Sequence, residues 1–187
     1  MLEKLPAQVG RALRHARPGL GSLVCHSDAV SSAQPVIVVS SPAFADHASI
    51  PVRYTADGDG LSPPLGWLNV PANTRSVALL VEDADSPTPA PLVHAIAWQL
   101  SPVLTELAEG ELMIDHRHAS LGLNSFLRPG WMPPDPPPGH GPHRYGFQIF
   151  ALDHDPDLGS EPGRRALIHA LRGHTLARGL LIGLYER

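Results

Sequence analysis

Short apolar segments separated by turn residues dominate the sequence from Val36 onward. Clusters of Gly, Pro, Asp and Ser bound these segments, a pattern typical of antiparallel β proteins. The run Val77–Val81 is apolar throughout and is bounded by turn residues, so it predicts a buried strand rather than a helix. We predict strands at Val36–Val39, Arg53–Thr55, Ser76–Glu82, His94–Leu100, Arg144–Asp153 and Gly179–Glu186.

Apolar residues at helical spacing in the N-terminal segment predict an amphipathic helix that ends at Pro18 and Gly19. We expect this helix to pack on its own domain or on a second subunit, which would make the protein a homodimer. Binding to a membrane surface needs a larger apolar face with aromatic anchors, which this segment lacks. The apolar positions of the helix are Leu2, Leu5, Val9, Leu13 and Ala16.

Residues 21–35 are mostly small and polar, and they predict a linker. The chain is therefore divided into an N-terminal arm at residues 1–35 and one β domain at residues 36–187. A second helix is predicted over Glu161–Arg172, with Ser160 as its N-cap residue and Gly173 just past its end.

Composition narrows the classes of function. With 187 residues, 43% of them apolar, the chain can bury one good core. The net charge of −4 provides no basic surface for duplex nucleic acid, so nucleic acid is not an expected partner. A single cysteine excludes an intrachain disulfide and a cysteine-rich zinc site, which fits a reducing cytoplasm. The N-terminal segment lacks the long apolar run of a signal peptide or membrane span, so we expect a cytoplasmic protein without an integral membrane segment.

Candidate chemistry begins at the end of the predicted strand Ser76–Glu82, where Asp83 and Asp85 follow two positions apart. Paired carboxylates can hold a metal, act as acid and base, or cap turns. After a proline-rich bend, His94 opens the next strand. Strict alternation places His94 on the face of Ile96, Trp98 and Leu100, which we expect to be the core side.

His143 opens a later strand, in phase with Tyr145, Phe147 and Ile149. Its side chain can therefore point toward an aromatic, apolar side. If this strand neighbours the earlier ones, two histidines and two aspartates meet at a polar spot between hydrophobic walls.

These residues form motifs that resemble a known family. Asp-x-Asp-x-Pro, followed by a strand-opening histidine, and Gly-x-His-Arg-Tyr are similar to the two signature motifs of the phosphatidylethanolamine-binding protein family, in particular its bacterial Raf kinase inhibitor-like branch. The resemblance covers roughly residues 36–187, in the expected order. The motif residues here are Asp83, Asp85, Pro87, His94, Gly141, His143, Arg144 and Tyr145.

The resemblance implies a mainly β fold, with two antiparallel sheets in a Greek-key arrangement and a few peripheral helices. It also implies a small pocket for phosphate, a phospholipid head group or a carboxylate. A carboxylate suits an anion pocket if it orients and charges a histidine, or if it shares a proton. In place of a glycine-containing loop of the family, Met132–Asp135 would bring the negative charge of Asp135 to the rim. By motif position the pocket residues are Asp83, Asp85, Pro87, His94, His143 and Tyr145, with Pro136 and Pro137 in the loop above.

Three functions follow as hypotheses. The first is a non-enzymatic binding protein for a small anion, without a cofactor. The second is a metal-dependent hydrolase using Asp83, Asp85, His94 and His143. The pair His116 and His118 lacks the following acidic ligand of a metal-binding β-barrel. The third is an interaction protein that modulates a kinase or another protein partner. His140 stays open as a further pocket residue, whereas the remaining histidines, including His154, His169 and His174, are treated as surface or capping residues.

Overall fold

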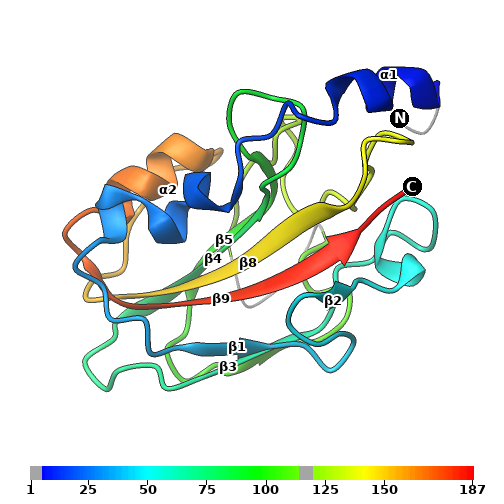
Figure 1. The fold of residues 1–187 in the computed structure, drawn as a ribbon. Coiled ribbons are helices and arrows are strands. Elements are labelled where there is room, and N and C mark those ends of the chain that lie inside the picture. The colour runs from blue at the N-terminus through cyan, green and yellow to red at the C-terminus, as the bar shows by residue number, and fades with distance from the viewer. Residues whose placement is uncertain (1–5, 114–119) are drawn as a thin grey trace.

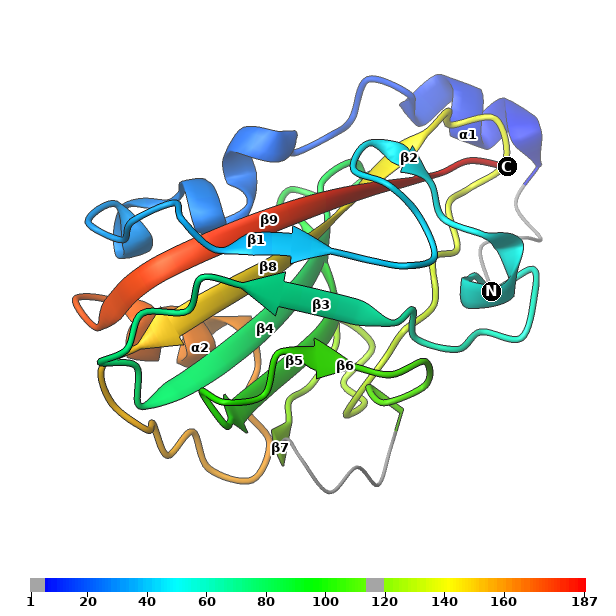
Figure 2. The same ribbon diagram turned by 90° about the horizontal axis from the view of Figure 1, so that it is seen from below.

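Two β-sheets form the framework of the protein (Figures 1 and 2). The computed structural model describes residues 6–113 and 120–187. Within them the larger sheet has the strand order β2-β9-β8-β4-β5-β7 and the smaller sheet β1-β3-β6. Neighbouring strands are antiparallel except β2 and β9, which are parallel. The predicted mainly β, two-sheet fold is confirmed.

The strand bounds are as follows. The larger sheet contains β2 (Ala48–Ser49), β4 (Ser76–Asp83), β5 (Leu92–Leu100), β7 (Ser120–Leu121), β8 (His143–Leu152) and β9 (Thr175–Tyr185), and the smaller sheet contains β1 (Val38–Ser40), β3 (Leu65–Leu68) and β6 (Glu106–Leu107).

Both faces of the larger sheet are covered, which explains why all eight residues of β4 are buried and why its run Val77–Val81 is apolar throughout. Val77, Leu79 and Val81 pack into an inner core between the two sheets. Ala78 and Leu80 pack into an outer core on the opposite face. Figure 1 shows helix α2 (Arg164–Leu171) on this outer face, beside the blue N-terminal turns.

The segment predicted as a linker is part of the outer core, so the linker prediction was wrong. It forms three short 3₁₀ turns, Leu20–Ser22, Val24–His26 and Asp28–Val30. Leu23 and Val30 within it are fully buried. The segment has few apolar residues, but they cover the outer face of β4 and β8. Its own sequence does not reveal this contact.

Both predicted helices exist, but with different limits. Helix α1 spans Ala7–Leu13 and packs through Gly10, whereas Val9 and Leu13 of the predicted apolar stripe are each 39% exposed. Leu2 and Leu5 of that stripe, like His116 and His118, lie outside the described residues.

Helix α2 begins after Gly163, and Ser160 is not its N-cap residue. The residues just before Gly163 do not join the helix, because the Pro162 carbonyl accepts a hydrogen bond from Leu123 N.

The predicted strand Arg53–Thr55 was wrong, since Val52–Tyr54 form a 3₁₀ turn there. The Val52 carbonyl closes that turn by accepting a hydrogen bond from Thr55 N. A Cβ on Gly58 would lie 2.3 Å from the same carbonyl, so a glycine is needed where the chain passes it.

A buried carboxylate ties the outer layer to the sheet. Glu82 lies on the outer face of β4 and is fully buried. One oxygen accepts a hydrogen bond from Arg164 Nε at 2.6 Å. The other accepts hydrogen bonds from Val24 N at 3.0 Å and Gln148 Nε2 at 2.8 Å. In turn, Gln148 Oε1 accepts one from Cys25 N at 2.7 Å. Strand, helix and N-terminal turns thus share one satisfied polar network.

We expect Glu82→Ala to lower the free energy of unfolding by about 3 kcal/mol, because it leaves Arg164, Val24 N and Gln148 without their acceptor in the core. Urea denaturation followed by circular dichroism measures this. The exposed Glu161 provides the control, and Glu161→Ala should change stability by less than about 0.5 kcal/mol. Equal effects of the two substitutions would contradict the role given to the network.

Candidate functional site

The ends of β4 and β8 bring two motif residues into direct contact. Asp83 closes β4 and His143 opens β8, and these two strands are neighbours. His143 Nδ1 lies 2.7 Å from Asp83 Oδ2, and both side chains are buried. Tyr145 and Phe147 follow in the inner core, so the predicted phase of His143 is confirmed.

His94 reaches the same place through an irregularity in β5. Val81 pairs with Ala95, but the next residue, Glu82, pairs with Val93, so His94 is an extra residue at a β-bulge. The prediction that His94 shares a face with Ile96 and Trp98 was therefore wrong, because those two residues pack in the outer core.

The bulge turns the His94 ring toward aromatic residues of the inner core. It meets Tyr145 edge to face, with ring centroids 5.1 Å apart, and lies 6.3 Å from Trp131. His94 Nδ1 donates a hydrogen bond to the Met132 carbonyl at 2.6 Å, and Met132 N donates back to the His94 carbonyl at 2.7 Å. The ring is thereby fixed in one orientation.

A small cavity of about 30 Å³ opens beside Asp83 and His94. A wider hollow of about 320 Å³ adjoins it and shares Phe126, Met132, Pro133 and Asp135 with it. The small cavity is lined by Asp83, Ser86, Pro87, Leu92, His94, Phe126, Met132, Pro133 and Asp135.

Of the predicted pocket residues, Asp83, Pro87 and His94 line the cavity directly. His143 lies behind Asp83, and Tyr145 packs between the rings of His94 and His143.

Asp85 is turned away from the cavity. It accepts hydrogen bonds from Arg144 Nε and Nη2, both at 2.6 Å, and from Arg144 N at 2.9 Å. Arg17 adds an ion pair at 3.4 Å. Burial alone would raise the pKa of Asp85, but the hydrogen bonds and charge of Arg144 lower it below its usual value. Asp85 is thus a buried anion that holds β8 and the arm.

Pro136 and Pro137 are buried in the proline-rich loop Pro129–Pro142 and do not line the cavity. Asp135, expected at the rim, does line it, and it forms an ion pair with Arg187. Arg187 also bonds to Asp57. Sequence reasoning missed Arg187, because a C-terminal residue carries no signal of which loop it will reach.

A chain of hydrogen bonds fixes the protons around His143. The Leu13 carbonyl accepts from His140 Nε2 at 2.9 Å, so the other nitrogen of a neutral His140 is an acceptor. Burial lowers the pKa of His140 and favours that neutral form. His143 Nε2, at 2.8 Å, must then donate to His140 Nδ1.

This leaves one proton between His143 Nδ1 and Asp83 Oδ2, held at 2.7 Å. Whether it resides on the imidazole or on the carboxyl group, the pair has no net charge. The Asp83 carboxylate is therefore compensated where it meets the cavity.

The arm supplies the last acceptor of that chain. A Cβ added to Gly10 would lie 2.1 Å from the Pro138 carbonyl, and one added to Gly139 would lie 2.8 Å from the Ala7 carbonyl. The backbone of helix α1 thus packs directly against the backbone of the proline-rich loop, with no room for a side chain at either glycine. Arg17 also donates to the carbonyls of His140 and Pro142.

The four residues considered as ligands of a catalytic metal do not form a shared ligand set. Asp85 faces Arg144, and both ring nitrogens of His143 are hydrogen-bonded. In the part of the chain that the structure describes, the one group with metal-ligand spacing is Asp153, His154 and His174, elsewhere in the fold.

Comparison with known proteins identifies a family whose members resemble this chain. The family model described as phosphatidylethanolamine-binding protein matches residues 40–186. A UPF0098 protein of Pyrococcus horikoshii is 38% identical over 151 residues, covering 79% of this chain and 75% of the relative.

Two solved structures are similar as well. A phosphatidylethanolamine-binding protein homologue from Chlamydia trachomatis has 36% identity and a TM-score of 0.75, over 81% of this chain and 97% of the other. Escherichia coli YbcL, described as a member of the mammalian family, has a TM-score of 0.76 over 81% of this chain and 98% of its own. At 24% identity, YbcL supports the fold alone. None of the helices within residues 6–113 and 120–187 has the length and apolar character needed to span a membrane.

We expect His94 to stay neutral at pH values where histidines of the unfolded chain are already protonated. Burial lowers its pKa and outweighs the opposing charge of Asp83. Below about pH 6.5 the unfolded chain therefore takes up a proton that native His94 does not, and this difference reduces the free energy of unfolding as the pH falls. NMR titration of the imidazole signals, with the urea-unfolded protein as reference, measures the shift. Protonation of native His94 at or above the reference value would contradict it.

Proposed function

The chain belongs to the phosphatidylethanolamine-binding protein family, and from that premise we propose that it binds a small phosphate-like anion reversibly in the cavity beside Asp83 and His94, without catalysis. The adjoining hollow, lined largely by apolar residues such as Trp131 and Met113, can take the organic part of a phosphate ester.

Two buried polar atoms carry this proposal. His94 Nε2 and the Tyr145 hydroxyl have no hydrogen-bond partner among the described residues. A buried polar group without a hydrogen bond costs roughly 1–3 kcal/mol of stability. The presence of two such groups next to each other supports a ligand that would bond to them. The Tyr145 ring packs edge to face against the ring of His94, which itself lines the cavity.

The charges around the cavity allow a small anion. Asp83 shares a proton with His143, and Asp135 is paired with Arg187. Burial raises the pKa of Tyr145 well above its usual value, so its hydroxyl remains a neutral donor. Each of the two carboxylates that line the cavity therefore has a partner beside it: the shared proton for Asp83, and for Asp135 the guanidinium of Arg187, which also bonds Asp57.

Binding should also take up a proton. Neutral His94 donates through Nδ1 to Met132, so its Nε2 is an acceptor and suits a protonated anion. Alternatively, a fully ionised anion at Nε2 raises the pKa of His94 and draws a proton onto that nitrogen. In both cases affinity rises as the pH is lowered from about 8 to about 6.

Removing the Tyr145 hydroxyl should weaken anion binding about tenfold or more, because the anion loses a buried donor. Isothermal titration of wild type and Tyr145→Phe with phosphate, phosphoethanolamine and sulfate tests this. Sulfate does not titrate near neutral pH, so it separates proton uptake by His94 from protonation of the ligand. Tyr54→Phe is the matched control, since the buried Tyr54 donates its hydroxyl to Glu109 at 2.8 Å and lines neither the small cavity nor the adjoining hollow. Failure of all three anions to bind wild type at millimolar concentration would refute the proposal.

Displacing helix α1 should weaken binding several-fold without altering any cavity residue. Gly10→Ala pushes the helix off the Pro138 carbonyl and removes the Leu13 acceptor that orients His140 and, through it, His143. Gly21→Ala is the control, because a Cβ there meets no atom within 4 Å. The same phosphate titration gives the answer, and equal affinities of the two variants would show that the arm does not support the site.

A further inference from the structure

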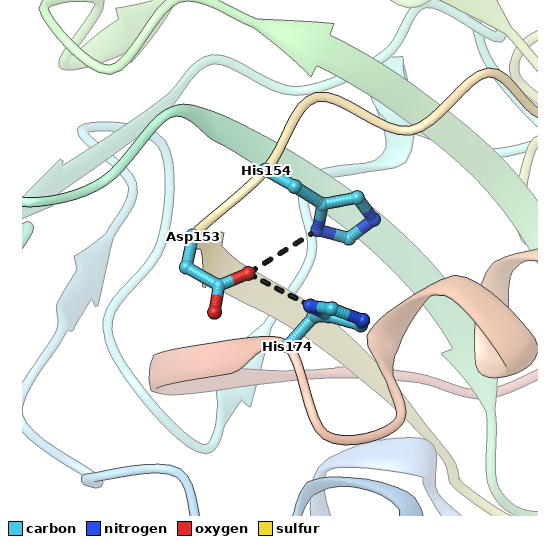
Figure 3. A group of neighbouring side chains, drawn as sticks. All are labelled: Asp153, His154 and His174. Atoms are coloured by element: carbon cyan, nitrogen blue, oxygen red, sulfur yellow. Dashed lines mark hydrogen bonds and ion pairs between the residues drawn. The ribbon is translucent and has the colours of Figure 1, made fainter.

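A second cluster of ligand-type side chains lies at the opposite end of β8 from the cavity. Asp153 and His154 directly follow β8, and His174 directly precedes β9 (Figure 3). The ten residues of β8 separate it from His143 by roughly 30 Å, at about 3.3 Å per residue. The cluster is therefore independent of the anion cavity and of the function proposed for it.

The spacing of the three side chains fits one metal ion. His174 Nδ1 lies 2.9 Å and His154 Nδ1 3.5 Å from the same oxygen of Asp153. All three ligand atoms lie within 4.8 Å of one another. A tetrahedral zinc ion with bonds of about 2.1 Å holds its ligand atoms roughly 3.4 Å apart, so small side-chain movements suffice.

The His154 ring is not explained by the protein alone. Its Nδ1 is shielded from solvent and has no hydrogen-bond partner among the described residues. Figure 3 shows both imidazoles on the same side of the Asp153 carboxylate, and their centroids are 4.3 Å apart. His174 alone would satisfy Asp153 as a simple surface ion pair. The second imidazole, whose Nδ1 faces the same carboxylate oxygen without a hydrogen bond, adds a second nitrogen ligand that an ion pair does not require.

Hydrogen bonds to backbone carbonyls hold the three residues in register. Asp153 N donates to the His174 carbonyl at 3.1 Å. The His154 carbonyl accepts from Ser76 Oγ at 2.6 Å. On the other side, Thr175 Oγ1 donates to the Leu171 carbonyl at 2.8 Å, which anchors the end of α2. The backbone positions of the three ligands are thus set before any ion arrives, which lowers the entropic cost of binding.

The surroundings also favour a cation. The cluster borders a hollow of about 440 Å³ whose lining includes Asp155, Asp157 and His169. The segment 153–157 contains three aspartates and neither lysine nor arginine. The open hollow leaves room for water or a further ligand at the remaining coordination position.

We propose that Asp153, His154 and His174 form a binding site for a divalent transition metal ion, with Zn²⁺ as the ion whose preferred ligands match best. Two imidazole nitrogens and one carboxylate oxygen are borderline ligands that suit Zn²⁺ better than Mg²⁺ or Ca²⁺. The bound ion would join the end of β8 to the start of β9 and so stabilise the turn around α2.

The test is a zinc titration of tag-free protein stripped of metal with EDTA, in competition with a fluorescent chelator. We expect wild type to bind one equivalent, and His174→Asn and Asp153→Asn to lower affinity at least about tenfold. His47→Asn is the matched control. His47 is also exposed and lies 2.9 Å from an aspartate, Asp46, but it lacks the second histidine, and its φ of 59° suits asparagine.

A second measurement needs no variant. In wild type, adding Zn²⁺ should shift the imidazole NMR signals of His154 and His174 and raise the melting temperature. Absence of zinc binding by wild type at micromolar concentration would overturn the proposal. So would equal affinities of wild type and the cluster variants, or an equal loss of affinity in His47→Asn.

Discussion

The hydrogen bond between Asp83 and His143 is the interaction on which the candidate site depends. It joins the ends of the two central strands, and it neutralises the carboxylate that would otherwise repel an anion. The proton in this hydrogen bond depends on residues outside the pair. His140 donates to the Leu13 carbonyl through Nε2, so its Nδ1 must accept the Nε2 proton of His143. The charge of the cavity is thus set by a helix that contributes no side chain to its lining.

The sequence predicted the parts of this arrangement that depend on local periodicity. The continuous apolar run Val77–Val81 predicted β4, and alternation along β8 predicted the phase of His143. His94 did not follow, since a β-bulge depends on how two strands pair and not on the strand that contains it. The role of Asp85 was missed for a similar reason. An Asp-x-Asp motif does not reveal that one carboxylate will be enclosed by Arg144 and Arg17.

Contacts made by segments far apart in the chain were the least predictable. The turns at residues 20–30 are polar enough to predict a linker, yet they cover the outer face of the sheet because Glu82 and Gln148 present acceptors for their backbone. Asp153 and His174 are likewise 21 positions apart, and only the return of the chain through α2 brings them together. The family match begins at residue 40. The segment before residue 40 nevertheless contributes to both the outer core and the candidate site. It is therefore an integral part of the fold, although it lies outside the family match.

The two irregularities of β5 affect how this chain is compared with relatives. One lies at His94, and the other lies between the pairs Val77–Leu100 and Leu79–Ala97, where Gln99 has a φ of 59°. At each irregularity one extra residue shifts the alternation of inner and outer side chains by one position. Ala95–Trp98, which lie between the two irregularities, therefore have the opposite phase to the residues on either side. A relative that lacks the extra residue at either position keeps the other β5 side chains on their layers, because regular alternation then runs through that point. In an alignment, a single-residue gap at position 94 or 99 therefore marks the loss of a bulge and not a repacked core, and at position 94 it also removes a side chain that lines the cavity.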